Sequence, residues 1–241
     1  MKILILGGTG EARELAERLT MHGHSVITSL AGRTSQPALP VGELRVGKFG
    51  GIPGLVAYLK ARGIERLVDA THPYAGLISV NAVGAAQAAG VPLVRYMRPA
   101  WIEPEGAKWW YVRSLGDAAG VLPSGATALI TTGHEGLEQV LARDDCRLVV
   151  RLIEPPSEPL PRHAKLILGR PPYTLAGERE LFEQEGITHL VTKNSGGEQT
   201  WAKLEAARLV GAEVIMIARP VYGPAVEVGT VEDAVRAVLG A

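Results

Sequence analysis

The sequence predicts an α/β protein made of two Rossmann-like or flavodoxin-like parallel-sheet domains with a cleft between them. Short apolar segments alternate with helical patterns along the whole chain, which is typical of parallel sheets covered by helices. A glycine turn joins the first apolar segment to the first helical pattern, and the order of elements then repeats. A chain of 241 residues has enough material for two such domains.

The apolar segments predict ten strands in two series of five. The strands of the first series are expected at 2–6, 24–29, 44–46, 66–70 and 92–95. Those of the second series are expected at 127–131, 147–153, 165–168, 188–192 and 213–218. Helices are expected in most of the gaps, at 11–21, 53–62, 76–89, 135–143, 174–185, 198–210 and 230–239.

A shift of 123 positions lays the second series over the first, which indicates an internal structural repeat. The matching pairs are Gly10-Glu11 with Gly133-His134, Gly63-Ile64 with Gly186-Ile187, Leu67-Val68 with Leu190-Val191 and, after a loss of two residues, Arg98-Pro99 with Arg219-Pro220. We therefore expect one domain at 1–99 and a second at 100–241, with the boundary between 99 and 125. The last helix either stays with the second domain or packs back on the first.

The turn after the first strand predicts a nucleotide site. The apolar run Ile3 to Leu6 leads directly into Gly7-Gly8-Thr9-Gly10-Glu11, and a helical pattern follows at once. The N–H groups at the amino end of a helix bind a pyrophosphate, and glycines allow its close approach. Gly8 and Gly10 supply the first half of the dinucleotide fingerprint, whereas Arg13 occupies the third glycine position.

The end of the second strand favours NADP over NAD. An NAD site places a carboxylate there for the ribose 2′-hydroxyl, but this chain has Ser29 and Leu30, followed by Arg33 and Thr34. A guanidinium suits a 2′-phosphate, so we expect NADPH bound by the glycine turn, Ser29, Arg33 and Thr34. The alternative is that Arg33 is a solvated loop residue.

The loop after the fourth strand, Asp69-Ala70-Thr71-His72-Pro73-Tyr74-Ala75, is dense in reactive side chains. It carries a carboxylate, a hydroxyl, an imidazole and a phenol at the edge of the sheet that faces ligands. Pro73 keeps His72 extended. His72 or Tyr74 could donate a proton, contact of Thr71 and His72 with the cofactor is equally plausible, and Asp69 could simply cap backbone N–H groups.

The corresponding loop of the second series, Thr192-Lys193-Asn194-Ser195-Gly196-Gly197, predicts an anion cradle before a helix. It lacks the spacing of a P-loop, so it does not indicate ATP chemistry. Other polar residues end the strands of this series, among them Thr132-Gly133 and Arg219. Ligands of open parallel sheets bind beyond the carboxyl ends of the strands, so we expect the site in the cleft lined by both domains.

In their order and spacing these motifs resemble the precorrin-6A reductase family of cobalamin biosynthesis. The resemblance covers the whole chain and is most specific in the Asp-Ala-Thr-His-Pro-Tyr-Ala loop. Its segments are Ile3 to Glu11 with Arg13, Ala31-Gly32-Arg33, residues 69–75 with Ser79-x-Asn81-Ala82, Arg98-Pro99-x-Trp101, Thr131-Thr132-Gly133, Lys193-Asn194-Ser195-Gly196 and Arg219-Pro220.

The resemblance implies an NADPH-dependent reduction of a macrocycle double bond, from precorrin-6A to precorrin-6B. A related branch of the family acts on the cobalt-containing analogue with NADH, and Arg33 argues for NADPH. The tetrapyrrole bears many carboxylates, which arginine binds bidentately. We expect it to contact Arg98, Thr132, Gly133, Lys193, Asn194, Ser195, Gly196 and Arg219, with Arg95, Arg151 and Arg170 also at the cleft.

Composition argues against other classes of protein. The 25 basic and 25 acidic side chains cancel, so no net field favours nucleic acid or a membrane surface. No apolar run approaches the roughly 18 residues of a membrane span, and the start is too short for a secretory leader. A single cysteine, Cys146, fits a reducing cytoplasm and is expected to be a buried bystander. The histidines show no convincing metal spacing, so we expect no metal.

There are two alternatives to this prediction, one enzymatic and one from another class of protein. The first is another NADP-dependent reductase, such as a short-chain dehydrogenase. That class needs Tyr-x-x-x-Lys, and no tyrosine of this chain has a lysine four positions on. The second is a non-catalytic NADP sensor that regulates a partner protein, and a test for turnover would separate it from an enzyme.

Overall fold

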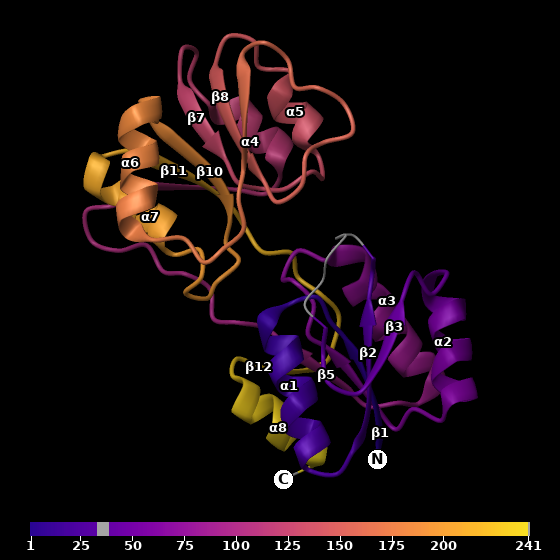
Figure 1. Ribbon diagram of the computed structural model, residues 1–241. Helices are drawn as coiled ribbons and strands as arrows, with labels where there is room; N and C mark the ends of the chain where they lie inside the picture. Colours follow the sequence, from indigo (N-terminus) through magenta and orange to yellow (C-terminus); the bar gives the residue numbers. More distant parts are fainter. Residues whose placement is uncertain (33–38, 241) are drawn as a thin grey trace. The chain divides into compact units, whose positions relative to one another are not determined.

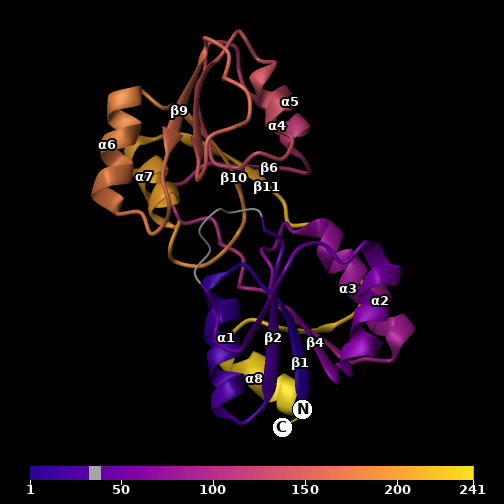
Figure 2. The same ribbon diagram turned by 45° about the vertical axis from the view of Figure 1, so that its right-hand side comes forward.

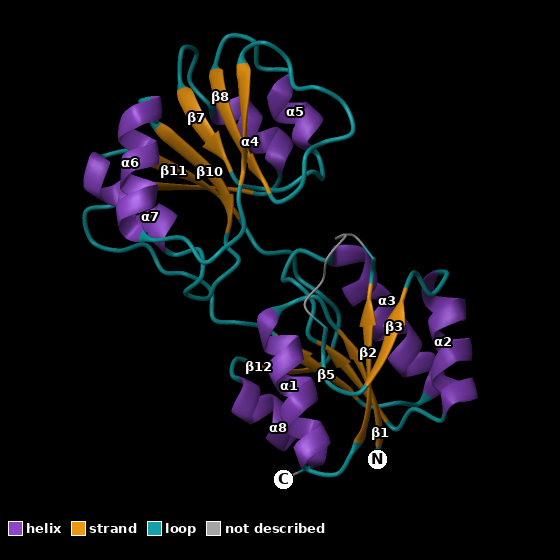
Figure 3. Ribbon diagram, viewed as in Figure 1, coloured by secondary structure: helices purple, strands orange, loops and turns teal. Residues whose placement is uncertain are grey.

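The structure, a computed structural model, describes residues 1–32 and 39–240 and divides into two compact units. Unit 1 comprises Met1–Pro99 and Pro220–Ala241, and unit 2 comprises Ala100–Arg219. Each unit contains a six-stranded parallel sheet with helices on both faces (Figure 1 and Figure 3). The predicted α/β class with two parallel-sheet domains is confirmed, while the cleft between the domains stays a prediction.

In unit 1 the strand order is β12-β5-β4-β1-β2-β3, and every neighbouring pair is parallel. The strands are β1 (Lys2–Leu6), β2 (Ser25–Leu30), β3 (Glu43–Val46), β4 (Arg66–Asp69), β5 (Leu93–Tyr96) and β12 (Val226–Val228). The helices are α1 (Gly10–Met21), α2 (Gly51–Arg62), α3 (Gly76–Ala89) and α8 (Val231–Leu239).

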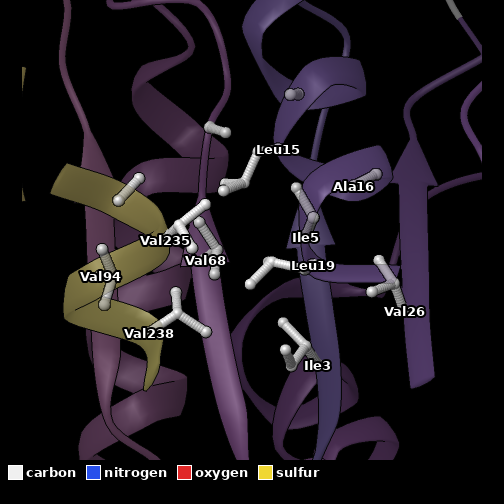
Figure 4. Close-up of a cluster of buried hydrophobic side chains, with 13 residues drawn as sticks. Ile3, Ile5, Leu15, Ala16, Leu19, Val26, Val68, Val94, Val235 and Val238 are labelled. Atoms are coloured by element: carbon white, nitrogen blue, oxygen red, sulfur yellow. The ribbon is translucent and has the colours of Figure 1, made fainter. Parts of the chain in front are cut away.

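Strand β1 is apolar on both sides because both faces of its sheet are covered. Ile3 and Ile5 belong to a core cluster formed with α1 and α8, whereas Leu4 and Leu6 belong to a second cluster formed with α2 and α3. Figure 4 shows the first cluster, in which side chains from both ends of the chain meet. Its labelled members on the helices are Leu15, Ala16, Leu19, Val235 and Val238.

The range expected for the second domain, 100–241, is wrong at its C-terminal end. Residues 220–241 belong to unit 1, since β12 pairs with β5 and α8 packs against α1. Of the two alternatives for the last helix, packing back on the first domain is therefore correct. Strand β12 has only three residues, and its pairing partner lies far away in the sequence. Neither property leaves a local pattern.

In unit 2 the strand order is β6-β11-β10-β7-β8-β9, again wholly parallel. The strands are β6 (Trp109–Val112), β7 (Thr127–Ile130), β8 (Arg147–Leu152), β9 (Ala164–Leu168), β10 (His189–Lys193) and β11 (Glu213–Ile217). The helices are α4 (Leu115–Val121), α5 (Leu137–Leu141), α6 (Leu175–Glu185) and α7 (Ala202–Val210).

The helices of unit 2 lie in two pairs. α6 packs against α7 on one face of the sheet, and α4 packs against α5 on the other (Figure 1 and Figure 2). Strand β6 and helix α4 were not predicted, because the stretch between 99 and 125 has little periodicity. In the part of the chain that the structure describes, no helix combines the length and the apolar character of a membrane span.

The equal strand orders confirm the predicted repeat of architecture. Strands β1 to β5 correspond to β7 to β11, and β12 takes the place in unit 1 that β6 takes in unit 2. The register corrects one of the matches, because Gly133 corresponds to Gly8 and not to Gly10. Ile5 pairs with Val68, and Ile130 pairs with Val191, which is the residue that matches Val68. Ile5 therefore corresponds to Ile130, and the glycines three residues later, Gly8 and Gly133, correspond to each other.

Candidate functional site

The glycine turn of unit 1 lies at the carboxyl end of β1 and leads directly into α1. Gly8 has a φ of 117°, which other residues rarely adopt, and a Cβ added there would meet no atom within 4 Å. Gly7 is required for packing instead, since a Cβ there would lie 2.9 Å from Thr28 Cγ2. The turn therefore keeps its backbone open to a ligand at Gly8.

Thr9 caps α1 and connects it to the neighbouring strand. Its Oγ1 accepts from the Ala12 N–H at 3.1 Å and donates to the Ala70 carbonyl at 2.9 Å. The remaining first-turn N–H groups, which include those of Gly10 and Glu11, have no partner within the helix. An open glycine turn before such a helix end fits the pyrophosphate of a dinucleotide.

Glu11 and Arg98 form an ion pair at this edge of the sheet. The Arg98 guanidinium lies 2.9 Å from the Glu11 carboxylate, and both side chains are partly buried. The pair joins a predicted cofactor residue in α1 to a predicted substrate residue after β5. Arg98 is thereby held in place within the predicted site of unit 1.

Ser29 ends up buried beside the glycine turn, near the end of β2. Its carbonyl accepts from the Gly7 N–H at 3.0 Å, and its Oγ accepts from Arg45 at 3.2 Å. The Arg45 guanidinium also lies 3.7 Å from the centre of the Phe49 ring. Sequence reasoning missed Arg45, although its strand neighbours Ser29. The predicted residues Arg33 and Thr34 lie outside the described residues.

Asp69 stabilises the loop after β4 by accepting hydrogen bonds from Thr71. It is 2 % exposed, and its Oδ1 accepts from both the N–H and the hydroxyl of Thr71, at 3.3 and 2.6 Å. The Thr71 hydroxyl lies 3.5 Å from that of Ser79 in α3. Of the alternatives left open for Asp69, the structure shows the one in which it caps the loop.

Arg95 is a buried structural residue, which corrects its expected place among the substrate contacts. It is 1 % exposed, and its Nε lies 3.5 Å from Asp69 Oδ2. Its Nη1 donates to the Glu227 carboxylate at 2.8 Å and to the Gly223 carbonyl at 3.1 Å. Arg95 thus joins the capped loop to the chain segment that forms β12.

The two predicted proton donors lie on the capped loop. His72 is exposed and Tyr74 is partly buried, with ring centres 5.8 Å apart. The Tyr74 N–H donates to His72 Nδ1 at 3.2 Å, which assigns the proton of a neutral imidazole to Nε2. Tyr222 holds the same loop, because its hydroxyl donates to the Pro73 carbonyl at 2.8 Å.

In unit 2 the loop after β10 is held through Asn194. Its side-chain amide is buried and forms two hydrogen bonds, of 2.8 and 3.0 Å, with the backbone N–H and carbonyl of Trp101. Its own carbonyl accepts from Arg219 Nε at 2.7 Å. Asn194 is therefore placed to shape this loop. Lys193 and Ser195 are partly buried there, and Gly196 is buried with a φ of 69°.

Arg151 also lies inside the fold, against the expectation that it faces the ligand. It is 7 % exposed, forms an ion pair with buried Glu178, and lies 4.0 Å from the centre of the Tyr173 ring. The partners of Arg151 come from later in the chain, so the sequence did not reveal them. The expected contact Arg170 is exposed and lies 3.4 Å from Glu154.

Lys203 is a buried lysine that sequence reasoning missed. It is 5 % exposed, and its Nζ donates to Thr131 Oγ1 at 3.2 Å. Burial lowers the pKa of Lys203 to about 7, and the nearby charge of Arg151 adds to this effect. The sequence does hold one signal for this burial. Lys203 precedes the small apolar residues Ala206 and Ala207 by three and four positions, which places all three on one face of a helix.

Two other kinds of chemistry receive no support from the described residues. No three of their histidine, cysteine, aspartate and glutamate side chains gather as metal ligands would. Cys146 is 3 % exposed, and burial raises the pKa of its thiol, which disfavours the nucleophilic thiolate.

Comparison with known proteins shows a consistent likeness. The family described as Precorrin-6x reductase CbiJ/CobK matches residues 2–239. The precorrin-6A reductase of Rhodococcus erythropolis is 45 % identical over 239 residues, which cover 98 % of this chain and 96 % of that protein. The cobalt-precorrin-6A reductase of Priestia megaterium is 31 % identical over an alignment of 252 positions, which covers 98 % of each chain. A solved structure of the CobK precorrin-6A reductase matches with a TM-score of 0.93 at 38 % identity, covering 100 % of this chain and 96 % of that one.

Proposed function

Because the chain belongs to the precorrin-6x reductase family (CbiJ/CobK), we propose that it reduces precorrin-6A to precorrin-6B in cobalamin biosynthesis, with NADPH as the reductant. The observation that carries this proposal is the likeness to a precorrin-6A reductase at 45 % identity over 98 % of the chain. The enzyme is then an oxidoreductase that acts on a carbon–carbon double bond of the macrocycle.

The carboxyl end of the unit 1 sheet is the proposed cofactor site. Gly7 to Glu11 would hold the pyrophosphate at the amino end of α1, and Thr71 would contact the cofactor from the loop after β4. Bound NADPH would supply the hydride. Preference for NADPH over NADH is supported by Ser29, which stands where an NAD site has an acid, and by Arg33.

The protein contributes mainly orientation to this reaction. Correct placement of two reactants is worth roughly 7–11 kcal/mol of barrier, whereas a positioned acid adds about 10²–10⁴-fold. Tyr74 or His72 would give a proton to the carbon next to the one that receives the hydride, and a bound water is the alternative proton donor. The hydrogen bonds that Asp69 accepts from Thr71 and that Tyr222 donates to Pro73 would hold this loop in position.

The carboxylates of the tetrapyrrole are the proposed partners of the polar groups around both sheets. Arginine and lysine side chains bind carboxylates through charge-assisted hydrogen bonds, and glycine-rich turns offer backbone N–H groups. The proposed contacts are Arg98, Thr132, Gly133, Lys193, Ser195, Gly196 and Arg219. Asn194 would act indirectly, because its amide holds Trp101.

Two finer points belong to the same proposal. The metal-free substrate is favoured over the cobalt-containing one, because the likeness to the precorrin-6A reductase is 45 % and that to the cobalt-precorrin-6A reductase is 31 %. A cytoplasmic location is supported by the use of only one cysteine.

An anaerobic assay with purified protein tests the function. Precorrin-6A and NADPH are mixed with the protein, and the loss of nicotinamide absorbance is followed beside the mass of the tetrapyrrole. We expect one NADPH consumed for each tetrapyrrole that gains two hydrogens, and slower oxidation of NADH. Binding of NADPH without any turnover of precorrin-6A would instead support the sensor alternative.

A further inference from the structure

We propose that unit 2 contains a carboxylate-binding subsite at the carboxyl end of β7, with Lys203 as its buried cation, and that a carboxylate binds there together with a proton. The proposal rests on the proposed function for the identity of the ligand, a carboxylate of the tetrapyrrole. It adds a residue and a proton linkage that the predicted substrate contacts do not contain.

The first argument is the position of Lys203 behind Thr131. Lys203 belongs to the first turn of α7 and is 5 % exposed, and its Nζ lies 3.2 Å from Thr131 Oγ1. Thr131 directly follows β7 and is only partly buried. Because the Thr131 hydroxyl donates to the Val191 carbonyl at 3.3 Å, a carboxylate at this turn would contact Thr132 or Gly133, with the Thr131 hydroxyl between it and the ammonium.

The second argument is the balance of buried charge. The charged groups that act on Lys203 are Arg151 from β8 and Glu178 from α6, and these two form an ion pair with each other. The rings of Trp101 and Tyr173 line the same cluster without adding charge. A protonated Lys203 is thus one buried positive charge in excess. A buried ammonium of this kind either needs a nearby anion or loses its proton and becomes a neutral amine.

The third argument is an unsatisfied polar group in the same turn. Thr132 is 4 % exposed, and its hydroxyl has no hydrogen-bond partner among the described residues. Buried hydroxyls are usually satisfied by the protein, by water or by a ligand. The turn after β7 therefore contains a hydroxyl that the fold itself does not use, and it is contacted through Thr131 by the excess cation Lys203; both groups suit a carboxylate.

The proton linkage follows from the state of the free protein. Burial, together with Arg151, brings the pKa of Lys203 to about 7, while Glu178 acts in the opposite direction. At pH 7.5 about three quarters of the molecules then carry a neutral amine at this position. A nearby carboxylate favours the charged form, so the amine takes a proton from solvent on binding. The expected uptake at pH 7.5 is about 0.7 proton per ligand.

Titration calorimetry tests this directly with the full chain. Precorrin-6A is titrated in the presence of NADP⁺, which cannot deliver hydride, at pH 7.5 in HEPES and in Tris. The difference between the two binding enthalpies, divided by the difference between the ionisation enthalpies of the two buffers, gives the number of protons taken up. We expect about 0.7 for the wild type and most of this lost in Lys203→Met. The matched control is Lys108→Met, an exposed lysine of the same unit, which should keep the uptake.

The proposal is overturned if precorrin-6A does not bind, if the wild type takes up no proton, or if folded Lys203→Met takes up as much as the wild type. Should Lys203→Met fail to fold, the wild-type Kd is measured from pH 6.5 to 9. It should rise by up to about tenfold per pH unit above 7, and a flat profile overturns the subsite. Turnover is measured separately, so that binding with proton uptake but without NADPH oxidation contradicts only the proposed function.

Discussion

The hydroxyl of Tyr222 donates a hydrogen bond of 2.8 Å to the carbonyl of Pro73. This bond joins two parts of unit 1 that are far apart in sequence, the segment leading to β12 and the loop after β4. Arg95 makes the same connection from inside, between Asp69 and the backbone of Gly223. The loop with both candidate proton donors therefore depends on residues near the end of the chain.

Tyr222→Phe tests this dependence with a small change, the removal of one hydroxyl group. The variant keeps the ring, whose centre lies 5.1 Å from the Arg95 guanidinium, and loses the hydrogen bond to Pro73. We expect a stability loss of about 1 kcal/mol and a lower kcat, because the loop is held less firmly. Urea unfolding and steady-state kinetics measure the two effects. Tyr58→Phe in α2 is the control, and equal kcat values for the two variants would contradict the prediction.

Arg95→Met should be strongly destabilising. It leaves Asp69, which is 2 % exposed, without its buried cation, and breaking such a pair typically costs about 3–5 kcal/mol. Denaturant unfolding measures the loss. The double variant with Asp69→Asn should cost less than the sum of the single changes, because the second change removes the uncompensated charge. Strict additivity would show that the two residues do not act as a pair.

Arg33→Ala tests the choice of cofactor. The loss of one charge-assisted contact to a 2′-phosphate should raise the KM for NADPH by roughly tenfold or more and leave the KM for NADH unchanged. Arg62→Ala is the control, since Arg62 pairs with Glu43 at the surface of the same unit. A similar increase for both cofactors would exclude a contact between Arg33 and the phosphate.

Tyr74→Phe and His72→Ala separate the two candidate proton donors. Removing a general acid typically lowers kcat by about 10²–10⁴-fold, whereas loss of a mere neighbour has a small effect. We expect only one of the variants to show the large decrease. Single-turnover reduction of precorrin-6A measures it without interference from product release. Full turnover in both variants would leave bound water as the donor.

The features that the sequence could predict are local ones. The apolar run from Ile3 to Leu6 followed by glycines is enough to indicate a buried strand, a tight turn and a helix start, and α1 begins at Gly10. The repeat could be found because the same local pattern recurs along the chain. The positions of polar residues at strand ends also follow from topology alone, since all strands of a parallel sheet end at one edge.

The features that the sequence could not predict depend on distant partners. Arg95 and Arg151 do lie near strand ends, but whether an arginine faces a ligand or a buried carboxylate is decided elsewhere in the chain. Buried Glu178 is that carboxylate for Arg151, whereas Arg95 pairs with buried Asp69 and also with Glu227 at the surface. Strand β12 was missed for the same reason, because its three residues become a strand only through pairing with β5.

Lys203→Met should change how the stability of the free protein depends on pH. In the folded state the pKa of Lys203 is about 7, below its ordinary value of 10.5, so the unfolded chain binds more protons between these pH values. The free energy of unfolding therefore rises with pH across this interval, by up to roughly 5 kcal/mol from Lys203 alone. Below pH 7 the charged lysine destabilises the folded state by this full amount. Lys203→Met removes this pH dependence. Its free energy of unfolding should therefore exceed that of the wild type by the largest amount at pH 6. Urea unfolding at pH 6, 7.5 and 9 measures the difference, with Lys108→Met as the control. Parallel curves for the wild type and Lys203→Met would show that Lys203 keeps an ordinary pKa.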